Sequence, residues 1–238
     1  MSADTTNDMT SGSPVRLILQ FMIPVCLGNI FQQFYNVADS IVAGQFIGVN
    51  ALAAIGSTGS LMFFVTGWLN GLSSGFAILV SQRFGAKRYD QMRHYVAMSI
   101  YLAAAFAIVM TVGLLILNEP ILRMMNFSDE IMPDVTAYMG IIYAGLIVTA
   151  AYNSLAAFLR ALGDSKSPLY FLIISAVINV VLDIAFIVCF GMGVEGCAYA
   201  TVIAQGISAV LCFVYILKKF PILHLKEEDF RISFRSFG

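Results

Sequence analysis

Charged side chains are scarce in this sequence. Asp, Glu, Lys and Arg make up 11% of the 238 residues, against roughly 25% in soluble domains, and hydrophobic residues make up 59%. A soluble fold of this length cannot hide so much apolar surface, so the composition predicts an integral membrane protein. The net charge of −1 provides no basic field for nucleic acid, which argues against a nucleic-acid partner.

Enzyme motifs are missing as well. The sequence contains no GxxxxGK[ST] loop for ATP, no HExxH and no GxSxG. Its four cysteines form no CxxC pair and lie in apolar runs, which is typical of small helix-packing residues; they are Cys26, Cys189, Cys197 and Cys212. We therefore predict a protein that is no enzyme, holds no cofactor and draws on an ion gradient if it transports.

Six apolar runs are each long enough to span a bilayer, which takes about 20 helical residues. The expected spans are 17–46, 51–82, 94–117, 133–159, 168–190 and 194–217. Ser167 before Pro168 is typical of an N-cap followed by proline in the first turn. The prediction is an all-α bundle of six transmembrane helices over 1–217, followed by a cytoplasmic tail or linker over 218–238.

Basic residues are distributed very unevenly between the two sides of this topology. Twelve of the thirteen lie at the N-terminus, in the loops after the second and fourth spans, or in the tail, and Arg123 alone lies opposite. The positive-inside rule makes the basic side cytoplasmic. We expect a multi-pass protein of the cell's inner (plasma) membrane with both termini in the cytoplasm.

Two acids, Asp39 and Asp183, lie inside the expected spans, and no Lys or Arg does. Each is seven residues from the outer end of its helix, which places both about 10 Å below the outer boundary. Acids inside a membrane are expensive, at roughly 2.5–3.5 kcal/mol on insertion scales, and mark functional sites. Two carboxylates without a basic partner hold a proton or recruit a cation such as sodium, which is the chemistry of a coupling site.

Other polar residues share helix faces with these acids. The stripes are Gln32, Tyr35 and Asn36 with Asp39; Ser175 and Asn179 with Asp183; Thr201, Gln205 and Ser208; and Thr149 with Asn153. Lipid does not solvate such stripes, so they should face one another or a water-filled cavity. For Thr149, Ser175 and Ser208 we favour interhelical hydrogen bonds, and for the acids we favour a function.

Small residues predict where helices bend or approach closely. Pro24 removes a hydrogen bond in the first span and Gly28 loosens the next turn, which permits a gating bend or a static kink. In the second span, the glycine repeat Gly67, Gly71 and Gly75 indicates close helix packing. Trp68 lies in mid-helix, away from an interfacial belt, which favours a position facing a cavity.

Three segments of the sequence are distinctive: PVCLGNIFQQFYNVADSIVAGQFIG at 24–48, RALGDSKSPLY at 160–170 and NVVLDIAFIVCFGMGVEGCAYATVIAQ at 179–205. They resemble the multidrug and toxin extrusion (MATE) transporters, nearest the bacterial DinF-like branch. The resemblance covers the chain in order. It implies one six-helix lobe of a twelve-helix antiporter that exports organic cations or drugs in exchange for protons or sodium.

The resemblance also implies roles for particular residues. The cation pocket of related members matches five positions of this sequence: Asp39, Asn153, Asn179, Asp183 and Thr201. Sodium would bind at Asp39, Asn179, Asp183 and Thr201, and Pro24 would lie in the gating helix. From the small residues and the polar stripes, rather than from the resemblance, we expect Gly28 to take part in the same gate and Gln32, Tyr35, Asn36 and Gln205 to line the cavity. Counting along the fourth span places Asn153 deeper than the acids, and tilt of a long helix would bring it into the pocket.

The sequence leaves other functions open. A flippase for a lipid-linked head group would have the same general bundle, although it would need basic residues in its cavity, and these spans have none. A non-transporting membrane subunit predicts that both acids are replaceable by Asn. A passive channel is a weaker alternative. Relatives have two lobes, so we expect a second six-helix lobe or a homodimer as partner, besides the bilayer and a small organic substrate.

Overall fold

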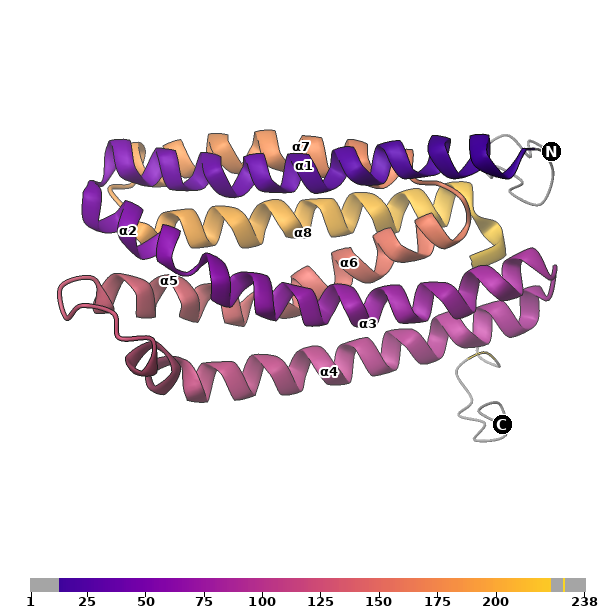
Figure 1. Ribbon diagram of the computed structural model, residues 1–238, viewed down its shortest axis with the longest axis horizontal. Helices are drawn as coiled ribbons and strands as arrows, with labels where there is room; N and C mark the ends of the chain where they lie inside the picture. Colours follow the sequence, from indigo (N-terminus) through magenta and orange to yellow (C-terminus); the bar gives the residue numbers. More distant parts are fainter. Residues whose placement is uncertain (1–12, 224–228, 230–238) are drawn as a thin grey trace.

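The computed structural model describes residues 13–223 and Asp229, and the expected tail lies otherwise outside these residues. Within this part the chain is helical. The helices are α1 (Pro14–Phe46), α2 (Val49–Ser57), α3 (Gly59–Gly85), α4 (Tyr89–Met124), α5 (Met132–Ala144), α6 (Leu146–Ala161), α7 (Lys166–Ile184), the π-helical turn η1 (Ala185–Cys189), α8 (Val194–Lys219) and the 3-10 turn η2 (Pro221–Leu223). The long helices run nearly parallel or antiparallel along one axis, and the short α2 crosses obliquely from α1 to α3 (Figure 1).

Five helical segments of the described chain are long and apolar enough to cross a membrane, and the bent pair α5–α6 raises the number to six. The share of residues buried inside the protein is only 6–33% in the most apolar stretch of each of the five. Because most of this apolar surface faces outward, the bilayer is its solvent. The all-α membrane bundle that the sequence predicts is confirmed.

The two ends of the bundle differ in charge. The α3–α4 and α6–α7 loops and the last turn of α8 form one end, which we call the basic end, with Arg83, Lys87, Arg160, Lys166, Lys218 and Lys219 (Figure 1). The α1–α2, α4–α5 and α7–α8 connections form the opposite, acidic end, with Asp129, Glu130 and Glu195.

The structure divides two segments that the sequence presents as single helices. Residues 51–82 fall into α2 and α3, which meet at Thr58, whose buried hydroxyl donates to the Ile55 carbonyl at 2.7 Å. Residues 133–159 fall into α5 and α6, which meet at Gly145 with a bend of 48°. A Cβ atom at Gly145 would overlap the Val202 side chain of α8, so the bend lies where this side chain packs directly on the glycine backbone.

The start of α7 corrects one detail of the sequence prediction. Ser167 is not the N-cap, because α7 begins at Lys166 and Pro168 follows two residues later. The side chain of Asp164 accepts the backbone N–H of Lys166 at 3.2 Å and that of Ser167 at 3.0 Å. Aspartate therefore satisfies the free N–H groups of this first turn, as it commonly does at helix starts.

Candidate cation-coupling pocket

Three helices bring the two membrane acids together. Asp39 comes from α1, Asn179 and Asp183 come from α7, and Thr201 comes from α8. Asp39 is 3% exposed, Asn179 and Asp183 are both 0% exposed, and Thr201 is half-buried. Each carboxyl is within electrostatic reach of the other. The four residues form one cluster, which we call the acid pocket.

Thr201 is the hub of the hydrogen bonds in the acid pocket. Its hydroxyl donates to Asp39 Oδ2 at 3.0 Å and accepts the Asn179 side-chain amide at 3.4 Å. The single hydroxyl proton is used on Asp39, so the Asn179 contact must use the amide N–H as donor. This chain of bonds links α1 to α7 through α8.

The remaining oxygens of the acid pocket are buried and have no hydrogen-bond donor within the described residues. They are Asp39 Oδ1, Asn179 Oδ1, Asp183 Oδ1 and Asp183 Oδ2. In the same part of the chain, neither acid forms a salt bridge with Lys or Arg. A buried carboxylate without compensation is expensive, so this group of oxygens fits a proton or a small hard cation.

Two residues at the acid pocket were missed by the sequence analysis. Tyr138 of α5 is 5% exposed and lies within electrostatic reach of both acids. Cys197 of α8 is fully buried and interacts with Asp183. Cys197 precedes Thr201 by four residues, so the shared helix face was a usable signal. Tyr138 gave none, because an aromatic residue in an apolar run is typical of packing.

One expected ligand forms no hydrogen bond with the acids among the described residues. Asn153 of α6 is half-buried, and its side chain makes no hydrogen bond within the described residues. Its neighbours point toward the basic half: the Ser154 hydroxyl lies 3.4 Å from that of Ser73, and the Tyr152 hydroxyl donates to the Pro168 carbonyl at 3.4 Å. This position agrees with the deeper level counted from the sequence.

The expected cavity-lining residues also differ from one another. Asn36 is exposed and its amide donates to Gln33 Oε1 at 3.3 Å on the same helix. Gln32 is half-buried, and the Tyr35 side chain lies outside the described part. Gln205 lies one helical turn from Thr201, and its buried Oε1 has no partner among the described residues. Of these, Gln205 most resembles an extension of the acid pocket.

The two expected gating positions lie on the side of α1 that faces the bundle. Pro24 is buried, and α1 continues through it as one helix of 33 residues. A Cβ atom at Gly28 would lie 4.0 Å from Leu169 and from Leu172 of α7. Gly28 thus faces α7 with room for a Cβ atom, about three turns from Asp39.

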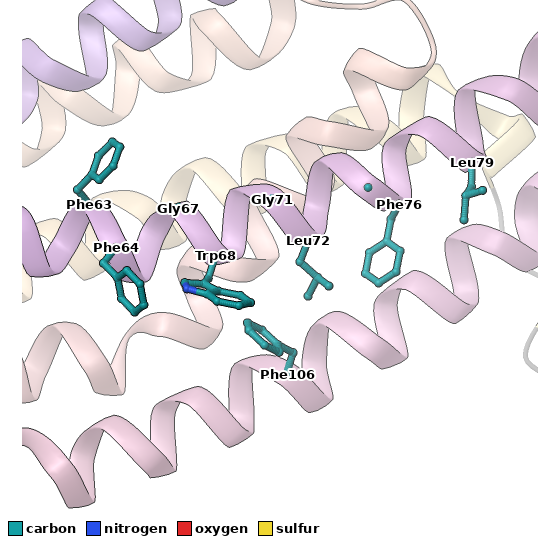
Figure 2. Close-up of a pocket in the computed structure, with 10 residues that line it drawn as sticks. Phe63, Phe64, Gly67, Trp68, Gly71, Leu72, Phe76, Leu79 and Phe106 are labelled. Atoms are coloured by element: carbon teal, nitrogen blue, oxygen red, sulfur yellow. The ribbon is translucent and has the colours of Figure 1, made fainter.

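An apolar groove of about 710 Å³ lies on α3, away from the acid pocket. Its walls are Phe63, Phe64, Gly67, Trp68, Gly71, Leu72, Gly75, Phe76, Leu79 and Phe106. Figure 2 shows Trp68 and Phe106 facing each other across the gap between α3 and α4, and the two rings are stacked with centroids 6.5 Å apart. Apart from the backbone of α3 itself and the residues next to each glycine, no described atom would lie within 4 Å of a Cβ at Gly67, Gly71 or Gly75, so no other helix of the described chain packs on them.

Comparisons with known proteins agree on one family. The MatE family model matches residues 24–185. The probable multidrug resistance protein YpnP of Bacillus subtilis (strain 168) is 31% identical over 211 residues, which are 89% of this chain and 47% of that protein. The probable multidrug resistance protein NorM of Thermotoga maritima is 24% identical over 209 residues, 85% of this chain and 44% of that protein. The chain spans about half the length of the curated relatives it matches.

Solved structures match the whole bundle. A crystal structure of MATE in the bent conformation superposes with a TM-score of 0.90 at 24% identity, covering 98% of this chain and 53% of that one. A crystal structure of MATE in the straight conformation gives 0.86 at 24% identity, covering 100% of this chain and 53% of that one. The fold is therefore that of half a MATE structure.

Proposed function

This chain belongs to the MatE family of membrane transporters, and we propose that it forms the N-terminal half of an efflux antiporter whose coupling cation binds in the acid pocket. The observation that carries the proposal is the group of four buried oxygens without donors, two of them on Asp183. Such a group is unstable when empty and charged, so its occupancy by a proton or sodium ion is linked to the conformation of the bundle.

The donor set suits both ions. Asp39 and Asp183 supply charge, and Asn179 and Thr201 supply neutral oxygens, which are the ligands that hard cations prefer. Protons would compete with sodium for the same carboxylates. We propose Asn153 and Gln205 as more distant polar residues of the same cavity, with Gln32, Tyr35 and Asn36 along α1.

Movement would involve α1. It carries Asp39 and lacks the backbone hydrogen bond that Pro24 removes. At Gly28 it has no side chain against Leu169 and Leu172 of α7. We propose that occupancy of the acid pocket changes the bend of α1, so that the site opens to one side at a time.

The relatives support a class of transported substrate. Several of them are described as probable multidrug resistance proteins, which supports a small organic cation or drug as substrate. The uneven distribution of basic residues supports a plasma-membrane orientation with both termini in the cytoplasm. The segments described above favour the DinF-like branch, and a second six-helix half would complete the transport path.

The test is sodium binding to the purified chain in detergent, measured by calorimetric titration at several pH values. Wild type should bind sodium, and lowering the pH should weaken the apparent affinity by competition. Asp183→Asn should abolish both effects, because the amide removes two of the four open oxygens as anionic ligands.

Asp134→Asn is the matched control, because Asp134 lies in the first turn of α5 and is not part of the acid pocket. It should bind sodium as wild type does. Unchanged, pH-sensitive sodium binding by Asp183→Asn would refute the assignment of the coupling site.

A further inference from the structure

A ladder of hydrogen bonds runs between the antiparallel helices α7 and α8 and ends in the acid pocket. Its four rungs are Asp164–Tyr215, Phe171–Ser208, Ser175–Ala204 and Asn179–Thr201. Counted from the basic end, successive rungs lie 7, 4 and 4 residues later in the sequence on the α7 side. On the α8 side they lie 7, 4 and 3 residues earlier, as expected for antiparallel helices. On α8, and on α7 from Phe171 onward, these steps keep the rungs on one face of the helix, while Asp164 lies in the loop just before α7.

Each of the two middle rungs joins a serine hydroxyl to a backbone carbonyl of the facing helix. Ser175, 3% exposed, donates from Oγ to the Ala204 carbonyl at 2.8 Å. Ser208, 1% exposed, donates from Oγ to the Phe171 carbonyl at 3.0 Å. A helical serine more often bonds a carbonyl of its own preceding turn. Here one hydroxyl comes from each helix, so the two bonds resist sliding in both directions.

The rung at the basic end ties the cap of α7 to α8. Asp164 is 8% exposed, and its Oδ2 accepts the Ser167 hydroxyl at 2.7 Å and the Tyr215 hydroxyl at 3.2 Å. Its Oδ1 holds the first turn of α7 through two backbone N–H groups. The start of α7 is therefore anchored in the same register as the two serine rungs.

The first helix lacks such a ladder. Among the described side chains, its hydrogen bond to α7 or α8 is the single one from Thr201 to Asp39. At Gly28 its contact with α7 is apolar, against Leu169 and Leu172. One wall of the acid pocket, α7 with α8, is thus fixed in register, and the other wall, α1, is held by one bond.

We propose that Ser175, Ser208 and the Asp164–Tyr215 pair are positioning residues for the cation site, because they fix the axial register that places Asn179 and Asp183 opposite Thr201. The Asn179–Thr201 bond is already 3.4 Å long, near the limit for a hydrogen bond. A slide by a fraction of the 1.5 Å helical rise per residue would break it. This inference rests on the proposed function of the acid pocket.

The test is a Ser175→Ala/Ser208→Ala double variant of the full chain, with sodium titration and amide hydrogen exchange as readouts. Sodium affinity should fall roughly three- to tenfold, in line with the modest strength of interhelical hydrogen bonds in membranes. Exchange should rise at the amides of 175–184. Ser175→Thr with Ser208→Thr keeps both hydroxyls and should restore affinity.

Ser99→Ala is the control, because Ser99 is also 3% exposed but donates to the Tyr95 carbonyl at 2.6 Å within α4. It should leave sodium affinity and exchange in α7 unchanged. The positioning role is refuted if the double variant keeps wild-type affinity, or if its exchange in α7 equals that of Ser99→Ala. Failure of the coupling site itself is read separately, from unchanged sodium binding by Asp183→Asn.

Discussion

Replacing Thr201 by valine removes the hub of the acid pocket while keeping the shape of the side chain. The hydroxyl donates to Asp39 Oδ2 at 3.0 Å and accepts from Asn179 at 3.4 Å, so the variant leaves two more buried polar groups without partners. It also removes one of the neutral oxygens proposed to bind sodium.

The expected loss of sodium affinity follows from the hydrogen bond that Thr201 donates to Asp39. A hydrogen bond to a charged acceptor contributes about 1.5–3 kcal/mol, and interhelical bonds in membranes reach about 1.7 kcal/mol. The overlap of these ranges, about 1.5 kcal/mol, corresponds to a roughly tenfold loss of affinity. Thr201→Val should therefore bind sodium about tenfold more weakly than wild type in a calorimetric titration at fixed pH.

Thr66→Val is the matched control for this change. The Thr66 hydroxyl donates to the Met62 carbonyl at 2.6 Å inside α3, and the residue is half-buried like Thr201. The same atoms are altered far from the acids. If Thr201→Val bound sodium as tightly as wild type, or lost no more affinity than Thr66→Val, the hub role would be wrong.

Two further predictions concern stability. Gly145→Ala should destabilise the fold by about 1–3 kcal/mol, since its Cβ would overlap Val202. Gly71→Ala, with open space at its Cβ, should stabilise the fold by up to about 1 kcal/mol. Thermal unfolding in detergent that ranked the two variants the other way would contradict this packing. Pro24→Ala should stabilise the fold by up to about 3 kcal/mol, because α1 is helical through Pro24 and the alanine N–H reaches the Gln20 carbonyl; an unchanged or lower unfolding temperature would show that Pro24 is not strained in this state.

The membrane bundle and the pairing of the acids could be predicted from sequence because the bilayer, as solvent, favours long apolar helices and disfavours isolated charges. Apolar runs of bilayer length have one stable environment, and equal depth brought Asp39 and Asp183 to the same level. The expectation that Ser175 and Ser208 form interhelical bonds is confirmed, since both donate to carbonyls of the facing helix. Thr149 instead donates to Gly145 in the preceding turn, at 3.5 Å.

The features that the sequence did not predict depend on contacts between residues far apart in the sequence. The bend at Gly145 lies against Val202, which is far away in the sequence. The N-cap of α7 is Ser165 rather than Ser167, and the first-turn N–H groups bond the Asp164 side chain, which also accepts the Tyr215 hydroxyl of α8. Tyr138 reaches the acids from α5. None of these contacts leaves a periodic pattern, so hydropathy and helix spacing cannot reveal them.

The groove on α3 also gives the protein a built-in optical reporter. Trp68 is the only tryptophan in the sequence, it is 55% exposed, and it stacks on Phe106 at the groove wall. All intrinsic tryptophan emission of this chain therefore originates at the groove, which shares no residue with the acid pocket. Lipids with brominated chains would quench it while the groove faces the bilayer, and a helix packed over the three glycines would shield it. The degree of quenching therefore reports what covers this face of α3.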